Sequence, residues 1–378
     1  MDKSSNKGIL KKRIIFHLPY KINNNTPSGS QIRPVMMIDA FKELGYHVEL
    51  IEGYVNKRKI AIRNIRKNIL KGIKYEFFYS ESSTMPTALT EKNHLPANPL
   101  LDFNFFLFCK KNKIPIGLFY RDIYWMYPDL YDAKVPYIKR IFSKFFYQYD
   151  LRMYKKTVST LFLPSLRMGN QLSRYNFNIE ALPPGLNGLN SSPNNGDIYI
   201  QRSGKLRILY IGGTSPLYNF SHILEAIKGT PQFILTICTR ENEWNIHHKI
   251  FSPHLGENIR IVHKHGDDIK ELYNTTDICL SSFKHHEYWD FAMGMKNFEY
   301  IAYGKPIIAT SNTEIGDFVT KNDIGWTISD NAEEARTLFS KLLKEPESIA
   351  HKKVNVEKIQ KENRWINRAK SVVRALNG

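Results

Sequence analysis

Short apolar runs rich in β-branched and aromatic residues alternate along the chain with longer segments whose apolar positions recur at helical spacing. This alternation is typical of βαβ units, in which helices connect parallel strands. In the first half we expect strands at 13–18, 47–52, 75–80, 115–120, 160–163 and 179–182. The helical segments between them lie near 30–44, 56–72, 98–112, 135–157 and 165–174.

The alternation stops between 183 and 204, where the sequence is rich in Pro, Gly, Asn and Ser and has no sustained period, as linkers do. It then resumes, with strands expected at 206–211, 233–238, 259–263, 277–281, 306–310 and 325–328. The second set of helical segments lies near 219–229, 241–250, 267–274, 295–303, 331–344 and 346–376.

The chain has 378 residues, and a single hydrophobic core stops growing at about 250 to 300 residues. We therefore predict two doubly wound, Rossmann-like α/β domains that face each other across a cleft. The first spans 1–183 and the second 206–360, with a linker at 184–205 and a C-terminal helix at 361–378 that crosses back to the first domain. Ligands bind such folds at the carboxyl ends of the strands, so the cleft suits two substrates.

The amino-acid composition is that of a folded protein and bears on its cellular compartment. Hydrophobic residues make up 42% and charged residues 24%, which excludes extensive disorder. Cys109, Cys238 and Cys279 each lie in an apolar run, as core cysteines do, so neither a disulfide framework nor a zinc site is expected. No run of about 20 apolar residues occurs, which predicts a protein without a membrane-spanning helix. We expect a cytoplasmic protein, with peripheral contact to the inner face of the plasma membrane.

The expectation of membrane contact comes from charge. Residues 1–200 hold 30 Lys and Arg against 15 Asp and Glu, so they carry most of the formal net charge of +18. The segments 55–72 and 137–156 interleave apolar or aromatic residues with basic ones, which suits an anionic lipid surface. The alternatives are basic faces of ordinary core helices, and a phosphorylated acceptor or a nucleic acid as the anionic partner.

The segment MGMKNFEYIAYGKPIIAT, residues 293–310, carries the clearest candidate chemistry. At helical spacing Lys296, Glu299 and Tyr303 share one face, and Gly304 ends the helix before the next strand. A carboxylate at 299 can accept two hydrogen bonds from a ribose, and an ammonium at 296 can meet a diphosphate. The alternative is an ion pair that only solvates the helix.

The pattern K-x-F-E-Y-x-A-x-G-K-P-I-I-A-T resembles the donor-site signature of GT-B glycosyltransferases, in particular the family-four type. The resemblance implies a metal-independent transferase with a nucleotide-diphosphate sugar as co-substrate and no other cofactor. It also implies that Glu299 holds the ribose in a C-terminal donor domain, while the N-terminal domain binds the acceptor. A second glutamate that the family often carries is replaced by Phe291, and Glu287 and Asp290 are candidates to substitute for it.

Further donor candidates lie at the ends of predicted strands. Gly212, Gly213 and Thr214 follow the first strand of the second domain, where a glycine turn exposes backbone N–H groups to phosphate oxygens. This turn resembles the first donor-domain loop of GT-B enzymes, although an ordinary tight turn is the alternative. Arg240 and His263 end the next two strands and can contact the diphosphate or the base, or serve as plain surface residues.

Acceptor candidates lie in the first domain. Asp122 follows a buried strand and can take a proton from an acceptor hydroxyl, or it can pair with Arg121. Gly29, Ser30 and Arg33 open a helix and can hold an acceptor phosphate or carboxylate together with Arg121. Ordinary capping by Ser30 is the alternative.

These features predict sugar transfer from a nucleotide-sugar donor to a lipid-linked or polysaccharide acceptor in cell-surface polysaccharide biosynthesis. One rival is a nucleotide-sugar epimerase of the same fold. A basic nucleic-acid-binding protein is the rival from another class, but the basic residues are joined to no nucleic-acid-reading motif, so no nucleic acid is expected.

Overall fold

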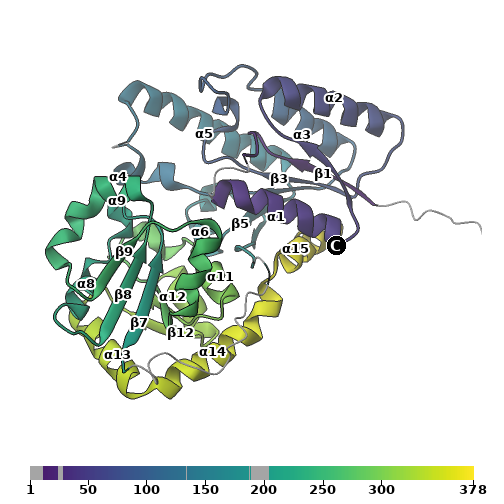
Figure 1. Ribbon diagram of the computed structural model, residues 1–378. Coiled ribbons are helices and arrows are strands. Elements are labelled where there is room, and N and C mark those ends of the chain that lie inside the picture. Colours follow the sequence, from purple (N-terminus) through teal and green to yellow (C-terminus); the bar gives the residue numbers. More distant parts are fainter. Residues whose placement is uncertain (1–11, 24–28, 133, 187, 189–203) are drawn as a thin grey trace, which may run out of the picture. The chain divides into compact units, whose positions relative to one another are not determined.

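The structure, a computed structural model, describes residues 12–23, 29–132, 134–186, 188 and 204–378 (Figure 1). The chain divides into two compact units. Unit 1 comprises the chain up to Pro183 together with Trp365–Gly378, and unit 2 runs from Pro184 to Arg364. Most of the linker expected at 184–205 lies outside the described residues.

Unit 1 is built on six parallel strands in the order β2-β1-β3-β4-β5-β6. The strands are β1 (Arg13–His17), β2 (His47–Ile51), β3 (Phe77–Glu81), β4 (Ile116–Phe119), β5 (Thr160–Leu163) and β6 (Ile179–Ala181). The order reverses between β1 and β3, and doubly wound sheets bind ligands beside such a reversal.

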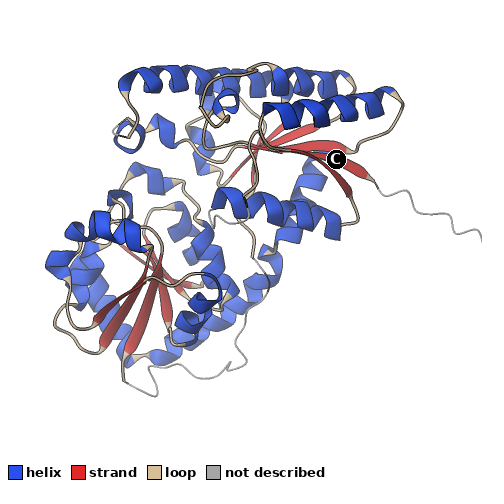
Figure 2. Ribbon diagram, turned by 45° about the horizontal axis from the view of Figure 1, so that its top comes forward, coloured by secondary structure: helices blue, strands red, loops and turns tan. Residues whose placement is uncertain are grey.

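Helices cover both faces of this sheet (Figure 2). They are α1 (Gly29–Glu43), α2 (Val55–Leu70), α3 (Leu101–Lys111), α4 (Pro128–Tyr131), α5 (Tyr137–Thr157), α6 (Arg167–Asn170) and α15 (Trp365–Asn377). Helices α1 and α15 lie against each other on one face, and α2, α3 and α5 cover the other. A Cβ added at Gly117 in β4 would lie 2.9 Å from the Leu376 side chain, so the C-terminal helix packs directly on this strand.

Unit 2 holds a second parallel sheet in the order β12-β11-β10-β7-β8-β9. Its strands are β7 (Leu206–Ile211), β8 (Phe233–Cys238), β9 (Ile259–Val262), β10 (Ile278–Ser281), β11 (Ile307–Thr310) and β12 (Gly325–Ile328). Its helices are α8 (Ser221–Ile227), α9 (Glu241–His247), α10 (Ile269–Asn274), α11 (Met295–Ala302), α12 (Glu314–Lys321), α13 (Ala332–Lys344) and α14 (Pro346–Gln360). This strand order is that of the Rossmann fold.

Alternate side chains of β7 enter two separate cores, one on each face of the sheet. Ile208 and Tyr210 pack with α8 and α13, whereas Leu209 and Ile211 pack with α11, α12 and α14. Burial on both faces explains why the strands of a parallel sheet are apolar throughout.

The twelve predicted strands are confirmed, each within two residues at either end. The helix predictions differ from the structure in several places. Helix α4 was not predicted, and the helix expected at 165–174 is the short α6 followed by a 3-10 turn (η3, Ser173–Tyr175). Helix α12 was not predicted, because it is short and contains Gly316, whose N–H is capped by the Thr313 side chain. The single helix expected at 346–376 is two helices, α14 and α15, separated by a 3-10 turn (η9, Lys361–Asn363) and the extended Arg364. The C-terminal helix therefore begins at Trp365 and not at 361.

Candidate functional site

The carboxyl ends of neighbouring strands bring the donor candidates of unit 2 to one edge of the sheet. Gly212 directly follows β7, Arg240 lies two residues beyond β8, and His263 directly follows β9. Helix α11 connects β10 to β11, so it begins at this same edge with Lys296 and Glu299 in its first turns. The structure thus places the predicted donor residues along one end of a parallel sheet.

Helix α11 presents the faces that its sequence predicts. Phe298, Ile301 and Ala302 are buried in the core. The side chains of Lys296 and Glu299 are 43% and 34% exposed, so a ligand can reach them from solvent.

Two polar contacts hold the Glu299 carboxylate in place. Lys296 Nζ lies 2.7 Å from Oε2, and the Tyr273 hydroxyl donates a hydrogen bond to Oε1 at 3.1 Å. Burial, reinforced by the Glu299 charge, raises the pKa of Tyr273 well above its ordinary value, so the phenol stays a donor. A carboxylate accepts about four hydrogen bonds, so capacity remains for ligand hydroxyls.

Tyrosines fix the surroundings of this carboxylate. The rings of Tyr273 and Tyr303 stack with centroids 3.9 Å apart. The Tyr300 hydroxyl accepts a hydrogen bond from the Ile211 N–H at 3.0 Å and lies 3.3 Å from the Ile211 carbonyl oxygen. Because Ile211 ends β7, helix α11 is tied to the point where the glycine turn leaves the sheet.

The glycine turn is shaped by its neighbours. A Cβ at Gly212 would lie 2.5 Å from the Tyr210 hydroxyl, and one at Gly213 would lie 2.6 Å from Glu243 Oε1, so a side chain at either position would have to displace its neighbour. The Thr214 N–H donates to Glu243 Oε1 at 2.9 Å, so a carboxylate already occupies this N–H. The Thr214 hydroxyl is buried and meets no hydrogen-bond partner in the described part of the chain.

Arg240 and His263 lie on the surface beside this turn. Arg240 precedes the first residue of α9 and is exposed. His263 is also exposed, and its Nδ1 lies 2.9 Å from the Thr239 carbonyl oxygen, which fixes its ring next to the loop after β8. Their contacts with a nucleotide stay predictions.

In unit 1, Asp122 follows β4 as expected and is half-buried, and its Oδ1 accepts a hydrogen bond from the Tyr124 N–H at 2.9 Å. The carboxylate that holds Arg121 is Glu81, which is fully buried at the end of β3. Arg121 Nη2 lies 3.2 Å from Glu81 Oε2 and donates to the Tyr20 hydroxyl at 2.8 Å.

The predicted anion cradle at the start of α1 needs correction. The helix begins at Gly29, so Ser30 lies inside it and does not cap it, and its carbonyl oxygen accepts a hydrogen bond from the Tyr20 hydroxyl. Arg33 is only 3% exposed; its guanidinium lies 3.5 Å from the Phe119 ring centroid, and its Nε lies 3.3 Å from Glu81 Oε1. Arg33 therefore faces the interior and does not meet an anion at the helix start.

Sequence analysis missed Tyr273, Glu243 and Glu81. Glu81 carried a readable signal, because a carboxylate at the end of a mostly aromatic strand needs a cationic partner when that strand is buried. Tyr273 and Glu243 carried none, since each meets its partner only through the folding of separate helices.

Replacing Tyr273 with phenylalanine tests its part in positioning Glu299. We expect the dissociation constant of the nucleotide ligand to rise roughly two- to twelvefold, the loss of one hydrogen bond, with the fold unchanged. Calorimetric titration measures the change, and Tyr303→Phe, which keeps the stacked ring, is the matched control. Equal affinities of the Tyr273 variant and the parent would contradict the positioning role.

Comparison with known proteins gives the same architecture. Residues 195–371 match the family glycosyl transferases group 1. No curated protein matches the chain. HepE of Anabaena, solved in complex with UDP and glucose, is 12% identical with a TM-score of 0.63, over 97% of this chain and 99% of its own.

Two further solved structures are similar over nearly their full lengths. Sucrose-phosphate synthase of Thermosynechococcus elongatus is 12% identical with a TM-score of 0.65, over 96% of this chain and 98% of its own. WaaG, a glycosyltransferase involved in lipopolysaccharide biosynthesis, is 15% identical with a TM-score of 0.59, over 97% and 100%. At these identities the likeness shows a shared fold.

The two parallel sheets and the similar solved structures define the GT-B fold. Residues 195–371, which include most of unit 2, match the model of glycosyl transferases group 1.

Proposed function

We propose that this protein binds a nucleotide-diphosphate sugar on unit 2 and transfers the sugar to a glycan acceptor on unit 1. The observation that carries the proposal is the half-exposed Glu299 carboxylate, held by Tyr273 and Lys296 at the carboxyl edge of the sheet. A carboxylate fixed in this way suits the two neighbouring hydroxyls of a ribose.

We assign the other steps of the transfer to separate residues. Lys296 and the backbone of the turn at Gly212 and Gly213 stabilise charge on the leaving diphosphate. Asp122, oriented by the Tyr124 N–H, acts as the base toward the acceptor hydroxyl. The proposed transfer uses no metal ion and no cofactor besides the sugar nucleotide.

The similar proteins guide the choice of substrates. HepE was solved with UDP and glucose, and WaaG is involved in lipopolysaccharide biosynthesis. We therefore take a UDP-sugar as the first donor to test. A lipid-linked or polysaccharide acceptor in cell-surface polysaccharide biosynthesis, on the cytoplasmic side of the membrane, is the acceptor class that we propose.

Calorimetric titration with UDP, GDP, ADP and dTDP tests the donor site. We expect saturable binding of at least one of them, and release of that diphosphate from its sugar nucleotide when a glycan acceptor is added. Conversion of the sugar nucleotide to its epimer without acceptor would establish the epimerase instead. Salt-sensitive binding of oligonucleotides without affinity for any nucleoside diphosphate would refute the transferase.

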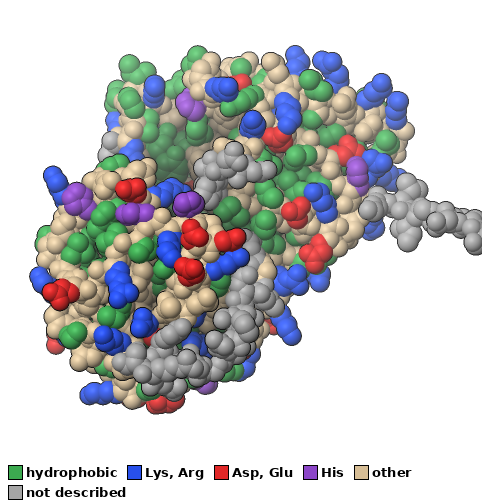
Figure 3. Space-filling model, in the orientation of Figure 1, with side chains coloured by type: hydrophobic (Ala, Val, Ile, Leu, Met, Phe, Trp, Pro, Cys, Tyr) green, Lys and Arg blue, Asp and Glu red, His purple; other side chains and the backbone are tan. Residues whose placement is uncertain are grey.

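The proposal includes contact with an anionic membrane through the first half of α5. Tyr137, Ile138, Ile141, Phe142 and Phe145 recur at helical spacing and are between 42% and 81% exposed. Figure 3 shows hydrophobic side chains gathered at the upper left, where α5 begins. Exposed Lys134 and Lys139 lie close by in the sequence. An apolar stripe with basic neighbours suits a surface of anionic lipid.

Helix α2 does not share this property. The apolar stripe expected on this helix consists of Ile62, Ile65 and Ile69. Ile62 and Ile65 are buried within unit 1, and Ile69 is half-buried. The membrane proposal therefore rests on α5 alone. Within the described part of the chain, none of the helices has the length and apolar character of a transmembrane segment.

Replacing Ile138, Ile141 and Phe145 together with serine tests the membrane contact. We expect affinity for phosphatidylglycerol vesicles to fall at least about 100-fold, because each insertion contributes about 1.5–3 kcal/mol. Vesicle co-sedimentation measures the loss, and nucleotide binding should be unchanged. The matched control replaces Ile60 and Leu70, exposed residues of α2, with serine. Equal losses in both variants would contradict the assignment to α5.

A further inference from the structure

A small cavity opens at the carboxyl end of the sheet in unit 1. Its volume is about 210 Å³, and its lining includes Tyr20, Ser30, Tyr54, Ser83, Thr84 and Thr90. These residues follow β1, β2 and β3 or lie at the start of α1. The cavity therefore lies beside the reversal of strand order, where doubly wound sheets bind ligands.

The lining is polar and almost uncharged. Serine and threonine hydroxyls both donate and accept hydrogen bonds, and tyrosine adds a flat apolar ring with a polar tip. No Asp, Glu or Arg is among the described residues that line the cavity, and Lys21 supplies the one cation among them. Such a surface matches a ligand that carries many hydroxyls and little charge.

The nearby arginines do not turn this cavity into an anion site. Arg121 donates to the Tyr20 hydroxyl and forms an ion pair with the fully buried Glu81. Arg33 shares the same carboxylate and faces the Phe119 ring. Neither guanidinium is part of the lining.

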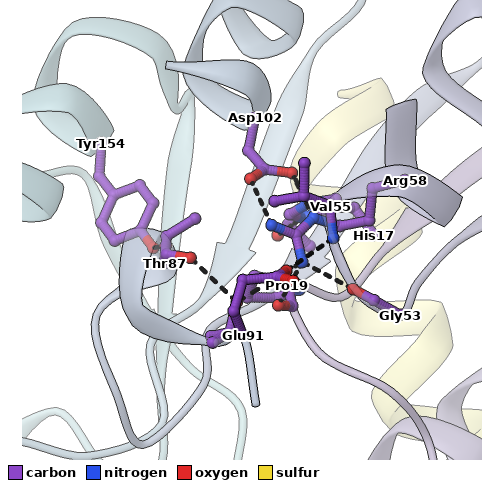
Figure 4. A network of polar contacts seen from close by, with 11 residues as sticks. His17, Pro19, Gly53, Val55, Arg58, Thr87, Glu91, Asp102 and Tyr154 are labelled. Atoms are coloured by element: carbon purple, nitrogen blue, oxygen red, sulfur yellow. Dashed lines mark hydrogen bonds and ion pairs between the residues drawn. The ribbon is translucent and has the colours of Figure 1, made fainter. Parts of the chain in front are cut away.

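Arg58 contacts the two loops that carry the lining tyrosines, and Figure 4 shows this network of polar contacts. It is 1% exposed, and its Nη1 donates to the carbonyl oxygens of Pro19 at 2.7 Å and Gly53 at 2.6 Å. Each carbonyl belongs to the residue just before a lining tyrosine, Tyr20 or Tyr54. One buried guanidinium therefore fixes the loops after both β1 and β2.

Arg58 is itself held by a buried acid. Its Nε lies 3.0 Å from Asp102 Oδ1 and its Nη2 lies 3.2 Å from Oδ2, a bidentate pair. His17 Nε2 also lies 3.0 Å from Oδ1, and burial lowers the pKa of His17. Burial alone would raise the pKa of Asp102, but the hydrogen bond from His17 and the charge of Arg58 outweigh it and lower that pKa, so the carboxylate stays ionised.

The opposite wall is held by α5. The Tyr147 hydroxyl donates to the Thr84 carbonyl oxygen at 2.6 Å, and Asp150 Oδ2 accepts from the Thr87 N–H at 2.7 Å. The Thr87 and Tyr154 hydroxyls lie 3.0 Å apart. Both walls are thus fixed before any ligand arrives, which reduces the entropy lost on binding.

We propose that this cavity binds one uncharged sugar ring of the acceptor, and that Arg58 is a positioning residue for it. The proposal rests on the proposed function, because it takes unit 1 as the acceptor side. The cavity is smaller than the roughly 300–1,000 Å³ typical of sites for drug-sized ligands, which fits a single ring. Recognition here works through hydroxyl groups, in place of the acceptor phosphate or carboxylate that the sequence had suggested.

Saturation-transfer NMR with the methyl glycosides of glucose, galactose, mannose and N-acetylglucosamine, each at millimolar concentration, tests the site. We expect at least one glycoside to bind. Its affinity should fall at least about threefold in Thr84→Val, which removes one hydroxyl, and further in Tyr54→Ala. Inorganic phosphate should not compete. The proposal would be overturned if none of the four glycosides bound, or if both variants bound the glycoside as tightly as the parent protein does. Competition by phosphate would also overturn it.

Arg58→Lys tests positioning, because lysine keeps the charge but cannot reach both carbonyl oxygens and Asp102 together. Glycoside affinity should fall while UDP affinity on unit 2 stays unchanged, and the surface variant Arg63→Lys on the same helix should match the parent. Unaltered glycoside affinity in a folded Arg58→Lys protein would refute the positioning role. If the parent protein bound no nucleotide, the proposed function would be refuted instead. Failure of the sugar cavity and failure of the donor site are therefore distinguishable.

Discussion

Glu299→Ala is expected to lose at least about 100-fold in affinity for the nucleotide ligand, because it removes two hydrogen bonds to a charged acceptor at about 1.5–3 kcal/mol each. Calorimetric titration with the nucleoside diphosphate that binds the parent protein measures the loss. Lys296 should remain in place, since it lies on an exposed helix turn, so the fold should be unchanged.

The matched control for this variant is Glu287→Ala. Glu287 lies in the 3-10 turn η8 (Glu287–Asp290) just before α11, and sequence analysis named it as a possible substitute for the glutamate that Phe291 replaces. Phe291 itself is buried. If Glu287→Ala lost the nucleotide and Glu299→Ala kept it, the ribose site would lie at η8 and the central assignment would be wrong.

Asp102→Ala is expected to lower the free energy of unfolding of unit 1 by about 3–5 kcal/mol, since it leaves the buried Arg58 without its counter-charge. Hydrogen exchange of peptides from β1 and β3 measures the loss, and peptides from unit 2 serve as the internal reference. Exchange in these strands measures the stability of unit 1 separately from that of the rest of the chain.

The double variant Asp102→Leu with Arg58→Met is the informative control. Apolar replacement of a whole buried ion pair is often neutral, so it should recover most of the protection that Asp102→Ala loses. If the double variant were as unstable as the single one, the loss would come from altered shape and not from an unpaired charge.

Central strands such as β4 and β11 were predictable because they are buried on both faces and therefore read as nearly continuous apolar runs. Lys296 and Glu299 were predictable for a similar reason, since residues three apart on a helix share a face. The signal is local in both cases. The break between α14 and α15 was missed because the charged residues around Lys361 continue the helical pattern without a glycine or proline to interrupt it.

The partners of the site residues were not predictable, because tertiary folding brings them together. Tyr273 lies 26 positions from Glu299, and Glu81 lies 40 positions from Arg121. Helices α2 and α5 also show that sequence alone does not predict tertiary contacts. Both are basic and amphipathic, yet the stripe of α2 is buried within unit 1 while that of α5 remains exposed. Periodicity identifies a stripe, but packing decides what covers it.

The two faces of α5 have a consequence for which acceptors can be reached. Ile138, Ile141 and Phe145 lie on one face, and Tyr147, Asp150 and Tyr154, which hold the cavity wall, lie on the opposite face. An α-helix with its side chains is about 10–12 Å across. With the outer face seated on lipid, as proposed, that thickness would separate the cavity from the headgroups. The proposed acceptor would then need a terminal sugar that stands at a matching height above the membrane.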